Sequence, residues 1–181
     1  MILDGGPVGI GIESTIIDLT EETPLILRPG FITQEMLSAV LGKKVALDPG
    51  LDAPDDARKP KAPGMKYRHY APRAELIIVD GAPADVVREI NARTKKNQAE
   101  GKRTVVIASD ETAAAYEAAD VLRIGRRGDE EAAAKHLYKL LRECDALGAD
   151  AVYSESFSAP GLGEAVMNRL LKAAGHTVVR V

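Results

Sequence analysis

The stretch Leu76-Ile77-Ile78-Val79-Asp80-Gly81-Ala82-Pro83 decides the fold of most of this chain. Its first four residues are all apolar, and three of them are β-branched, which is typical of a strand buried on both faces. Pro83 suits the first turn of a helix, and Asp85 places a negative charge near that helix N-terminus. A strand that passes almost directly into a helix predicts one β-α unit of a parallel sheet.

The same alternation continues to the end of the chain. Asp129 can cap a long helix with one apolar face, and Gly148 can end it. We therefore predict an α/β domain over residues 74–181, a Rossmann-like or flavodoxin-like, mostly parallel sheet with helices on both faces, which folds by itself. The further strands are expected at residues 104–108, 121–124, 151–153 and 176–181, and the further helices at 112–119, after 129, and at 163–174.

Residues 1–42 predict a small β-β-α fragment. Two short β-prone runs, 14–19 and 24–29, are separated by a polar hairpin turn. Thr33 can then cap a helix that Gly42 ends. Such a fragment is too small to hold a core, so we expect it to pack loosely or to pair with another chain. Its glycine-rich start, with nothing before it to pack against, indicates a chain cut from something longer.

Residues 43–73 have the composition of a linker. Five prolines interrupt them, and charged residues fill the interval between Asp52 and Lys61. The end of this segment, Pro63-Gly64-Met65-Lys66-Tyr67-Arg68-His69-Tyr70-Ala71-Pro72, is too aromatic to be a mere spacer. Proline stiffens it at both ends, so this stretch, called the strap below, can lie across a neighbouring cleft.

Composition excludes several classes of protein. The chain has 181 residues, of which 45% are apolar, enough to bury a core. A net charge of −3 argues against binding nucleic acid through bulk charge. The single cysteine, Cys144, cannot form an internal disulfide and is expected to be buried. No run approaches the roughly 20 apolar residues of a membrane span, no signal peptide is evident, and we expect a cytoplasmic protein. His136 and His176 are isolated, so the sequence predicts no metal site.

Three segments carry a family resemblance. They are Gly11-Ile12-Glu13-Ser14-Thr15-Ile16-Ile17-Asp18 with Leu27-Arg28-Pro29-Gly30, the strap, and Gly161-Leu162-Gly163-Glu164-Ala165-Val166-Met167-Asn168-Arg169-Leu170. In this order they resemble the end of the YrdC-like catalytic domain, the interdomain linker, and the last helix of the C-terminal domain of two-domain threonylcarbamoyl-AMP synthases. The resemblance implies that residues 1–42 are the remnant of the catalytic domain, 43–73 the linker or strap over the active site, and 74–181 a Rossmann-like accessory domain.

The resemblance also implies a reaction. Enzymes of this family join L-threonine, bicarbonate and ATP to give threonylcarbamoyl-AMP and pyrophosphate, for N6-threonylcarbamoyladenosine modification of tRNA. Mg²⁺ is expected with ATP, and downstream tRNA-modification proteins are expected to take the adenylate, without direct tRNA binding by this chain. Most of the family's nucleotide pocket would lie upstream of Met1. We therefore assign no catalytic residue and expect the chain to be inactive alone.

Three residues are candidates for binding, each with an alternative. The resemblance implies that Ser14 contacts threonine, although a serine there could instead satisfy a local turn. It assigns Arg28 to ATP, since a guanidinium fork suits phosphate or ribose, and the alternative is a solvated surface arginine. It assigns Tyr67 of the strap to ATP as well. The alternative is that the strap aromatics dock only for stability, which competes seriously for Tyr70.

Other residues receive weaker assignments. We expect Thr15 to be structural. We also expect Asn168 and Arg169 to face solvent. His69 has no evident carboxylate beside it to make it a general base. Gly161-Leu162-Gly163 at a helix start only weakly suggests a phosphate loop. A different class of function also fits: a non-catalytic, Rossmann-like module that binds a nucleotide or a protein partner and regulates a catalytic domain.

Overall fold

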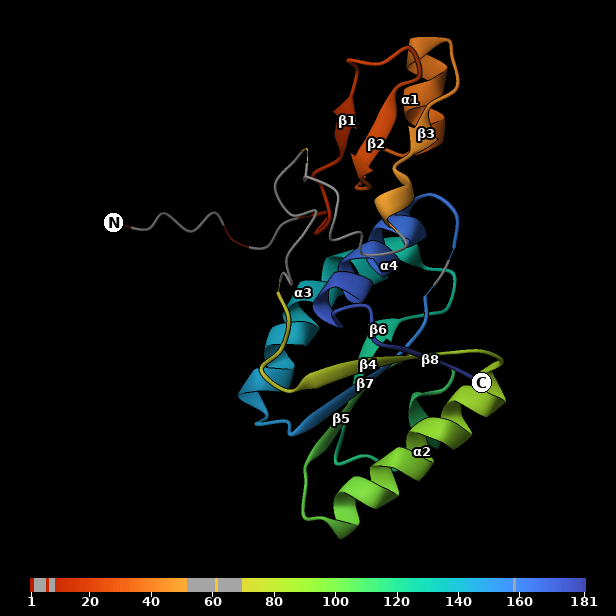
Figure 1. Ribbon diagram of the computed structural model, residues 1–181. Helices are drawn as coiled ribbons and strands as arrows, with labels where there is room; N and C mark the ends of the chain where they lie inside the picture. The colour runs from red at the N-terminus through yellow and green to blue at the C-terminus, as the bar shows by residue number, and fades with distance from the viewer. Residues whose placement is uncertain (2–5, 7–8, 52–60, 62–69, 158) are drawn as a thin grey trace.

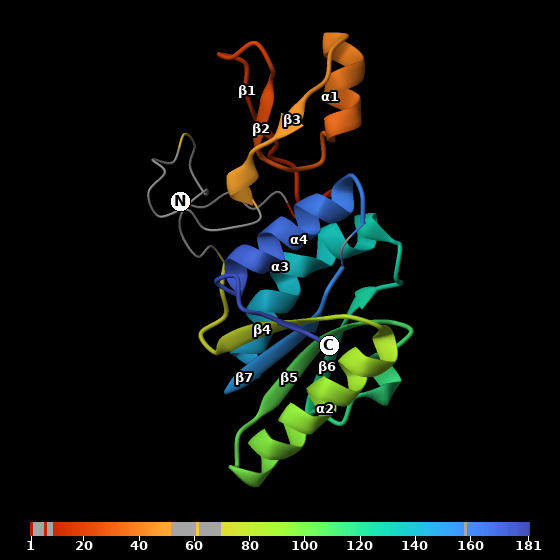
Figure 2. The ribbon, with the colours of Figure 1, turned by 45° about the vertical axis from the view of Figure 1, so that its right-hand side comes forward.

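The computed structural model describes residues 1, 6, 9–51, 61, 70–157 and 159–181. It contains a small three-stranded sheet and a larger five-stranded sheet. In Figure 1 the small sheet lies at the top, helices α3 and α4 lie in the middle, and the large sheet and α2 lie below. Figure 2 shows the same layers after a rotation, with α4 between the two sheets.

The small sheet begins with the predicted hairpin. Strands β1 (Ile16–Asp18) and β2 (Leu25–Arg28) pair antiparallel, as expected. Strand β3 (Ala46–Leu47) then pairs parallel with β2, and the 3₁₀ helix η1 (Pro49–Leu51) follows it. Sequence assigned residues 46–51 to the linker, because a two-residue strand has no periodicity to detect. The small sheet therefore extends past residue 42.

Helix α1 (Gln34–Leu41) begins and ends where the sequence predicted. The Thr33 hydroxyl accepts a hydrogen bond from the Met36 amide at 3.3 Å, and Gly42 ends the helix with φ 64°. No residue of α1 is buried, and Val40 is 86% exposed. Further large apolar side chains are exposed on and around this helix, at Ile32, Met36 and Leu41.

The large sheet is parallel throughout, which confirms the predicted fold class. Its strand order is β6-β5-β7-β4-β8, and every neighbouring pair runs parallel. In the classic Rossmann order the first and second strands of the domain are neighbours, whereas here β7 lies between β4 and β5. The strands are β4 (Glu75–Asp80), β5 (Thr104–Ser109), β6 (Asp120–Gly125), β7 (Ala151–Glu155) and β8 (Val178–Arg180).

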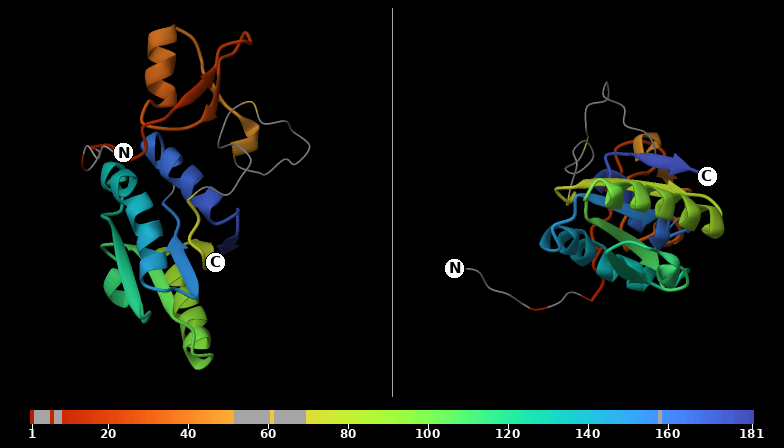
Figure 3. Two further views of the ribbon diagram at one scale, coloured as in Figure 1. Left: turned by 90° about the vertical axis from the view of Figure 1, so that its left-hand side faces the viewer. Right: turned by 90° about the horizontal axis from the view of Figure 1, so that it is seen from below.

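Helices cover both faces of this sheet, as Figure 3 shows in two further views. Helix α2 (Pro83–Ala99) packs on one face, where Ile90 contributes to a core that includes Val79 and Val106. Helices α3 (Glu130–Ala146) and α4 (Leu162–Ala173) cover the other face. Alternate residues of β4 enter the two cores, because successive side chains of a strand point to opposite faces.

Two details of the large domain match the sequence analysis closely. The Asp129 carboxylate accepts from the Ala132 amide at 2.9 Å, so it caps α3 as predicted. Cys144 is fully buried in the core under this helix.

The expected helix at 112–119 is wrong, because only a 3₁₀ turn, η2 (Ala113–Ala115), forms there. The side chains of Thr112 and Tyr116, on either side of that turn, both hydrogen-bond to Glu155 on β7 instead.

The segment before β1 packs into the large domain. Ile12 is 2% exposed and belongs to the core under α3 and α4. A Cβ atom at Gly11 would lie 2.4 Å from the Ala134 carbonyl oxygen, so this backbone crosses α3 in direct contact. The expectation that all of residues 1–42 pack loosely is therefore wrong for this segment.

Among the described residues, no helix combines the length and apolar character that a bilayer-crossing helix needs.

Candidate functional site

The structure brings Ser14 and Arg28 together at one end of the small sheet. Arg28 ends β2, and its Nε donates to the Ser14 carbonyl oxygen at 3.1 Å. The Ser14 side chain is exposed, and Arg28 is half-buried. The Arg28 guanidinium and the Ser14 backbone are therefore in direct contact at this end of the small sheet.

Pro29 and Gly30 lead from β2 into a bend at Phe31 and Ile32, and residues 29–32, called the turn below, pack closely against Ser14 and Thr15. A Cβ atom at Gly30 would lie 2.6 Å from the Thr15 amide nitrogen and 2.7 Å from the Ser14 carbonyl carbon. Only glycine permits this approach, because no real Cβ atom tolerates such distances to backbone. The Thr15 hydroxyl donates to the Ile32 carbonyl at 2.9 Å, which gives Thr15 the structural role expected of it.

A second cation reaches this turn from the large domain. Arg169, on α4, donates through Nη2 to the Pro29 carbonyl oxygen at 3.0 Å and through Nη1 to Asn168 Oδ1 at 2.9 Å. Asn168 is 4% and Arg169 8% exposed, so the expectation that they face solvent is wrong. Helix α4 lies between the sheet and the small fragment, and the face that would meet solvent in an isolated domain is therefore covered.

Positive charge gathers at this junction. Burial first, and then the charges of Arg169 and Arg28, together lower the pKa of Lys172 to about 8. Burial also lowers the pKa of the Arg169 guanidinium, which Tyr138 partly opposes. A lysine whose protonation is disfavoured by two neighbouring guanidinium groups lies in a positive potential. Such a place attracts anions.

Of the strap, the structure describes residues 70–72. Tyr67 and His69 lie outside the described residues. Immediately before the strap, Lys61 forms a salt bridge of 2.9 Å with Asp18 on β1. Within it, the Tyr70 ring centroid lies 4.4 Å from that of Tyr138 on α3, with a tilt of 48°. The hydrogen bond from the Thr20 hydroxyl and the contact with Lys61 hold the pKa of Asp18 well below its usual range. Contacts at 61 and 70 tie the chain on either side of Tyr67 to β1 and to α3.

A cavity of about 480 Å³ opens between the small fragment and α4. This volume is in the range of small-molecule sites. Its lining is mainly apolar, with Glu164 and Asn168 as polar groups, and Pro29 lies at its wall beside the Arg28 turn. The other lining residues are Leu47, Leu51, Ala159, Pro160, Met167 and Leu171.

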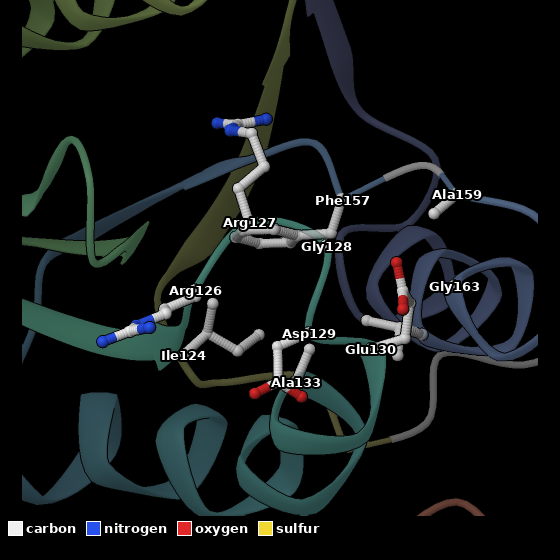
Figure 4. Close-up of a pocket in the computed structure, with 11 residues that line it drawn as sticks. Ile124, Arg126, Arg127, Gly128, Asp129, Glu130, Ala133, Phe157, Ala159 and Gly163 are labelled. Carbon is white, nitrogen blue, oxygen red and sulfur yellow. The ribbon is translucent and has the colours of Figure 1, made fainter.

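A second, smaller pocket lies at the N-termini of α3 and α4, and Figure 4 shows its lining. Phe157 and Gly128 lie on one side of the hollow, and Glu130 and Gly163 lie on another. Its volume is about 50 Å³, which holds a water or two but not a nucleotide. The Arg126 and Arg127 side chains extend away from the hollow in this view. The geometry therefore gives no support to a phosphate loop at Gly161-Leu162-Gly163.

The buried carboxylate of Glu155 organises the neighbouring strand ends, and the sequence analysis missed it. Glu155 is 1% exposed at the end of β7. It accepts from the Ser109 hydroxyl at 2.9 Å, from the Tyr116 hydroxyl at 2.7 Å and from Arg127 Nη2 at 2.7 Å, and also from Thr112. Burial and this carboxylate raise the pKa of Tyr116. An acidic residue directly after the buried run Val152-Tyr153-Ser154 was the available signal.

Metal-ligating side chains do not gather in the described part of the chain. Within those residues, no group of three or more histidine, cysteine, aspartate or glutamate side chains could hold a metal ion. The described residues therefore supply no ligand set for the Mg²⁺ that the resemblance implies.

Fold and site together define a class: a two-part α/β protein in which cationic side chains from both parts meet at one turn. The chain matches the family model "Threonylcarbamoyl-AMP synthase, C-terminal domain" over residues 32–175, and it belongs to this family. It is 44% identical over 179 residues to the threonylcarbamoyl-AMP synthase of Bacillus subtilis, covering 99% of this chain and 50% of that protein. It is 43% identical to the synthase of Pyrococcus abyssi, covering 99% of this chain and 51% of that protein.

Solved structures agree with these relatives. The crystal structure of P. abyssi Sua5 complexed with L-threonine superimposes with a TM-score of 0.86 at 43% identity, covering 98% of this chain and 50% of that one. A C-terminal Sua5 domain from Pyrococcus horikoshii matches with a TM-score of 0.50 at 37% identity, covering 61% of this chain and all of that one. The chain thus spans about half the length of the curated relatives it matches.

Proposed function

We propose that this chain is the C-terminal half of a threonylcarbamoyl-AMP synthase. In this proposal residues 1–42 are the end of the catalytic domain, 43–73 the linker and strap, and 74–181 the accessory domain. The observation that carries it is the meeting of Ser14 and Arg28 at one turn, in a chain 43–44% identical to named synthases. The exposed apolar residues around α1 support the assignment of 1–42 to a larger catalytic domain, because such surface normally packs against something.

The proposed reaction needs an anionic nucleophile beside a polyanion. Threonine and bicarbonate lose water to give N-carboxythreonine, whose carboxylate oxygen bonds to the α-phosphorus of ATP. The bond from that phosphorus to the bridging oxygen of the β-phosphate breaks, and pyrophosphate leaves. Fixed positive charge and precise placement are the main contributions a protein can make to such a step.

The roles of the site residues follow from their chemistry. Ser14 presents an exposed hydroxyl that can hydrogen-bond threonine. Arg28 presents a guanidinium fork for the phosphates or ribose of ATP. Tyr67 would contact ATP from the strap, and the contacts at Lys61 and Tyr70 support a strap held close to this edge. Mg²⁺ would reach the site mainly through the phosphates of ATP and water, as is common for this ion.

We propose a cytoplasmic protein that hands its adenylate to downstream tRNA-modification proteins without binding tRNA itself. The net charge of −3 supports the absence of tRNA binding. The alternative of a regulatory module is not favoured, because relatives that match 99% of the chain are named as synthases.

The test is pyrophosphate release from ATP that depends on both threonine and bicarbonate. We expect none from residues 1–181 alone. We expect release from a chimera in which this chain replaces the matching half of the B. subtilis synthase. A folded chimera that fails to release pyrophosphate, while the intact B. subtilis enzyme does so in the same assay, would refute the proposal.

A further inference from the structure

The bond from Arg169 to Pro29 joins two residues that are 140 positions apart and belong to different parts of the molecule. Arg169 is on α4 of the large domain, and Pro29 directly follows the last residue of β2 in the small sheet. Figures 1 and 2 both show α4 as the large-domain helix nearest the small sheet. This hydrogen bond therefore joins the accessory domain directly to the turn that follows Arg28.

The bond also satisfies a group that needs it. Pro29 is buried, and a buried carbonyl without a partner is costly. The turn is otherwise fixed by the bond from Arg28 Nε to Ser14 and by the close approach of Gly30 to Thr15. Each of these two contacts lies within the small sheet. Arg169 supplies a third one from outside it.

Arginine is specifically suited to this place. Its planar guanidinium directs Nη2 to the Pro29 carbonyl while Nη1 is held by Asn168 Oδ1. A lysine ammonium would keep the positive charge but lacks the rigid fork that holds both bonds in one geometry. Arg169→Lys therefore separates the effect of the positive charge, which it keeps, from the effect of the guanidinium geometry, which it removes.

We propose that Arg169 is a positioning residue for the ATP site, which acts through Pro29 to hold Arg28 in place. This inference rests on the proposed function, in which Arg28 binds ATP. Arg169 itself does not need to touch the nucleotide. A guanidinium displaced from its bound position makes weaker hydrogen bonds to its ligand, so a contact that fixes the turn can change the affinity for ATP.

The contact itself is tested on residues 1–181 by amide hydrogen exchange. Arg169→Gln should speed exchange of the amides in residues 30–32 by about tenfold or more, with little change in β5 and β7. Exchange that is unchanged in residues 30–32 would overturn the proposal, because the turn would then not depend on Arg169.

The functional consequence is tested in the active chimera by kinetics. Arg169→Gln and Arg169→Lys should each raise the KM for ATP by about 10- to 100-fold, while kcat and the KM for threonine change less than about threefold. Asn168→Ala, which keeps the arginine and removes one of its anchors, should raise the ATP KM by a smaller factor. Arg88→Gln, on the exposed face of α2, is the matched control and should change nothing.

The outcomes separate the two proposals. An inactive wild-type chimera refutes the proposed function, and the role of Arg169 in ATP binding falls with it. An active chimera in which Arg169→Lys keeps the wild-type ATP KM overturns positioning in favour of charge alone. A fall in kcat together with rises in the KM for ATP and in the KM for threonine, all by similar factors, overturns the proposal in favour of a merely structural role. If Arg169→Gln does not fold, Asn168→Ala and Arg169→Lys still decide the question by the ATP KM.

Discussion

Replacing Glu155 with alanine should destabilise the large domain more than any other single change proposed here. The carboxylate is 1% exposed and accepts hydrogen bonds from donors on the β5 end, the η2 loop and Arg127. Alanine would leave these donors without their acceptor and Arg127 without its counterion. Each buried hydroxyl left without its acceptor, on Ser109 and on Tyr116, costs about 1–3 kcal/mol, so we expect the free energy of unfolding to fall by about 3–5 kcal/mol in total.

Arg127→Gln provides a graded comparison. The Arg127 side chain is 44% exposed, so water can replace part of its interaction with Glu155. The carboxylate also keeps its hydroxyl donors in this variant. We therefore expect the free energy of unfolding to fall by only about 1–2 kcal/mol. A fully buried hydrogen bond to a charged group would be worth more, but water solvates part of this one. Glu75→Ala, at an exposed carboxylate on β4, is the control and should change stability by less than about 0.5 kcal/mol.

The assay is urea denaturation of residues 1–181 followed by far-ultraviolet circular dichroism, with the slope compared between variants. The order of losses should be Glu155→Ala, then Arg127→Gln, then Glu75→Ala. A loss below about 1 kcal/mol for Glu155→Ala, at an unchanged slope, would refute the reasoning. It would mean that the surrounding hydroxyl groups find other partners or water at little cost.

Three further changes test other parts of the structure. Because the pKa of Lys172 is lowered from 10.5 to about 8, the unfolded chain binds more protons between these values and folding gains stability as pH rises. The unfolding free energy of the wild type minus that of Lys172→Met should therefore rise by up to about 3 kcal/mol from pH 8 to 10.5, and a difference independent of pH would contradict this. Gly30→Ala should displace the turn, because its Cβ atom would meet the backbone of Ser14 and Thr15. The chimera's kcat/KM for ATP and that for threonine should both fall by at least about tenfold. Wild-type kinetics would show that the turn adjusts freely. Tyr67→Ala in the chimera should cost about tenfold to a hundredfold in ATP-dependent adenylate formation while the melting temperature moves little; full activity with a melting temperature several degrees lower would make Tyr67 a docking residue.

The site was only partly predictable from the sequence. A family motif pointed to Ser14 and Arg28, and the structure places them in contact. Their assignment to threonine and ATP stays a prediction, as does that of Tyr67, which lies outside the described residues. Arg169 was expected in solvent because a helix pattern shows which face meets the sheet but not whether something covers the other face. Glu155 was missed because its donors come from residues up to 46 positions away.

The sequence by itself determined most of the elements of this protein. Runs of apolar residues defined the strands of the large sheet, and local signals such as Thr33, Gly42 and Asp129 defined where helices begin or end. These signals act within a few residues, because a cap or a buried face depends on neighbours along the chain. These signals can therefore be recognised in the sequence without any tertiary information.

The tertiary structure alone decided how these elements meet. It set the strand order, with β7 inserted between β4 and β5, and it placed Ile12 in the core of the other domain. It also brought Arg169 to Pro29. Each of these depends on contacts between distant residues, whose favourable energy exists only once the two surfaces are already packed, so no local pattern records them.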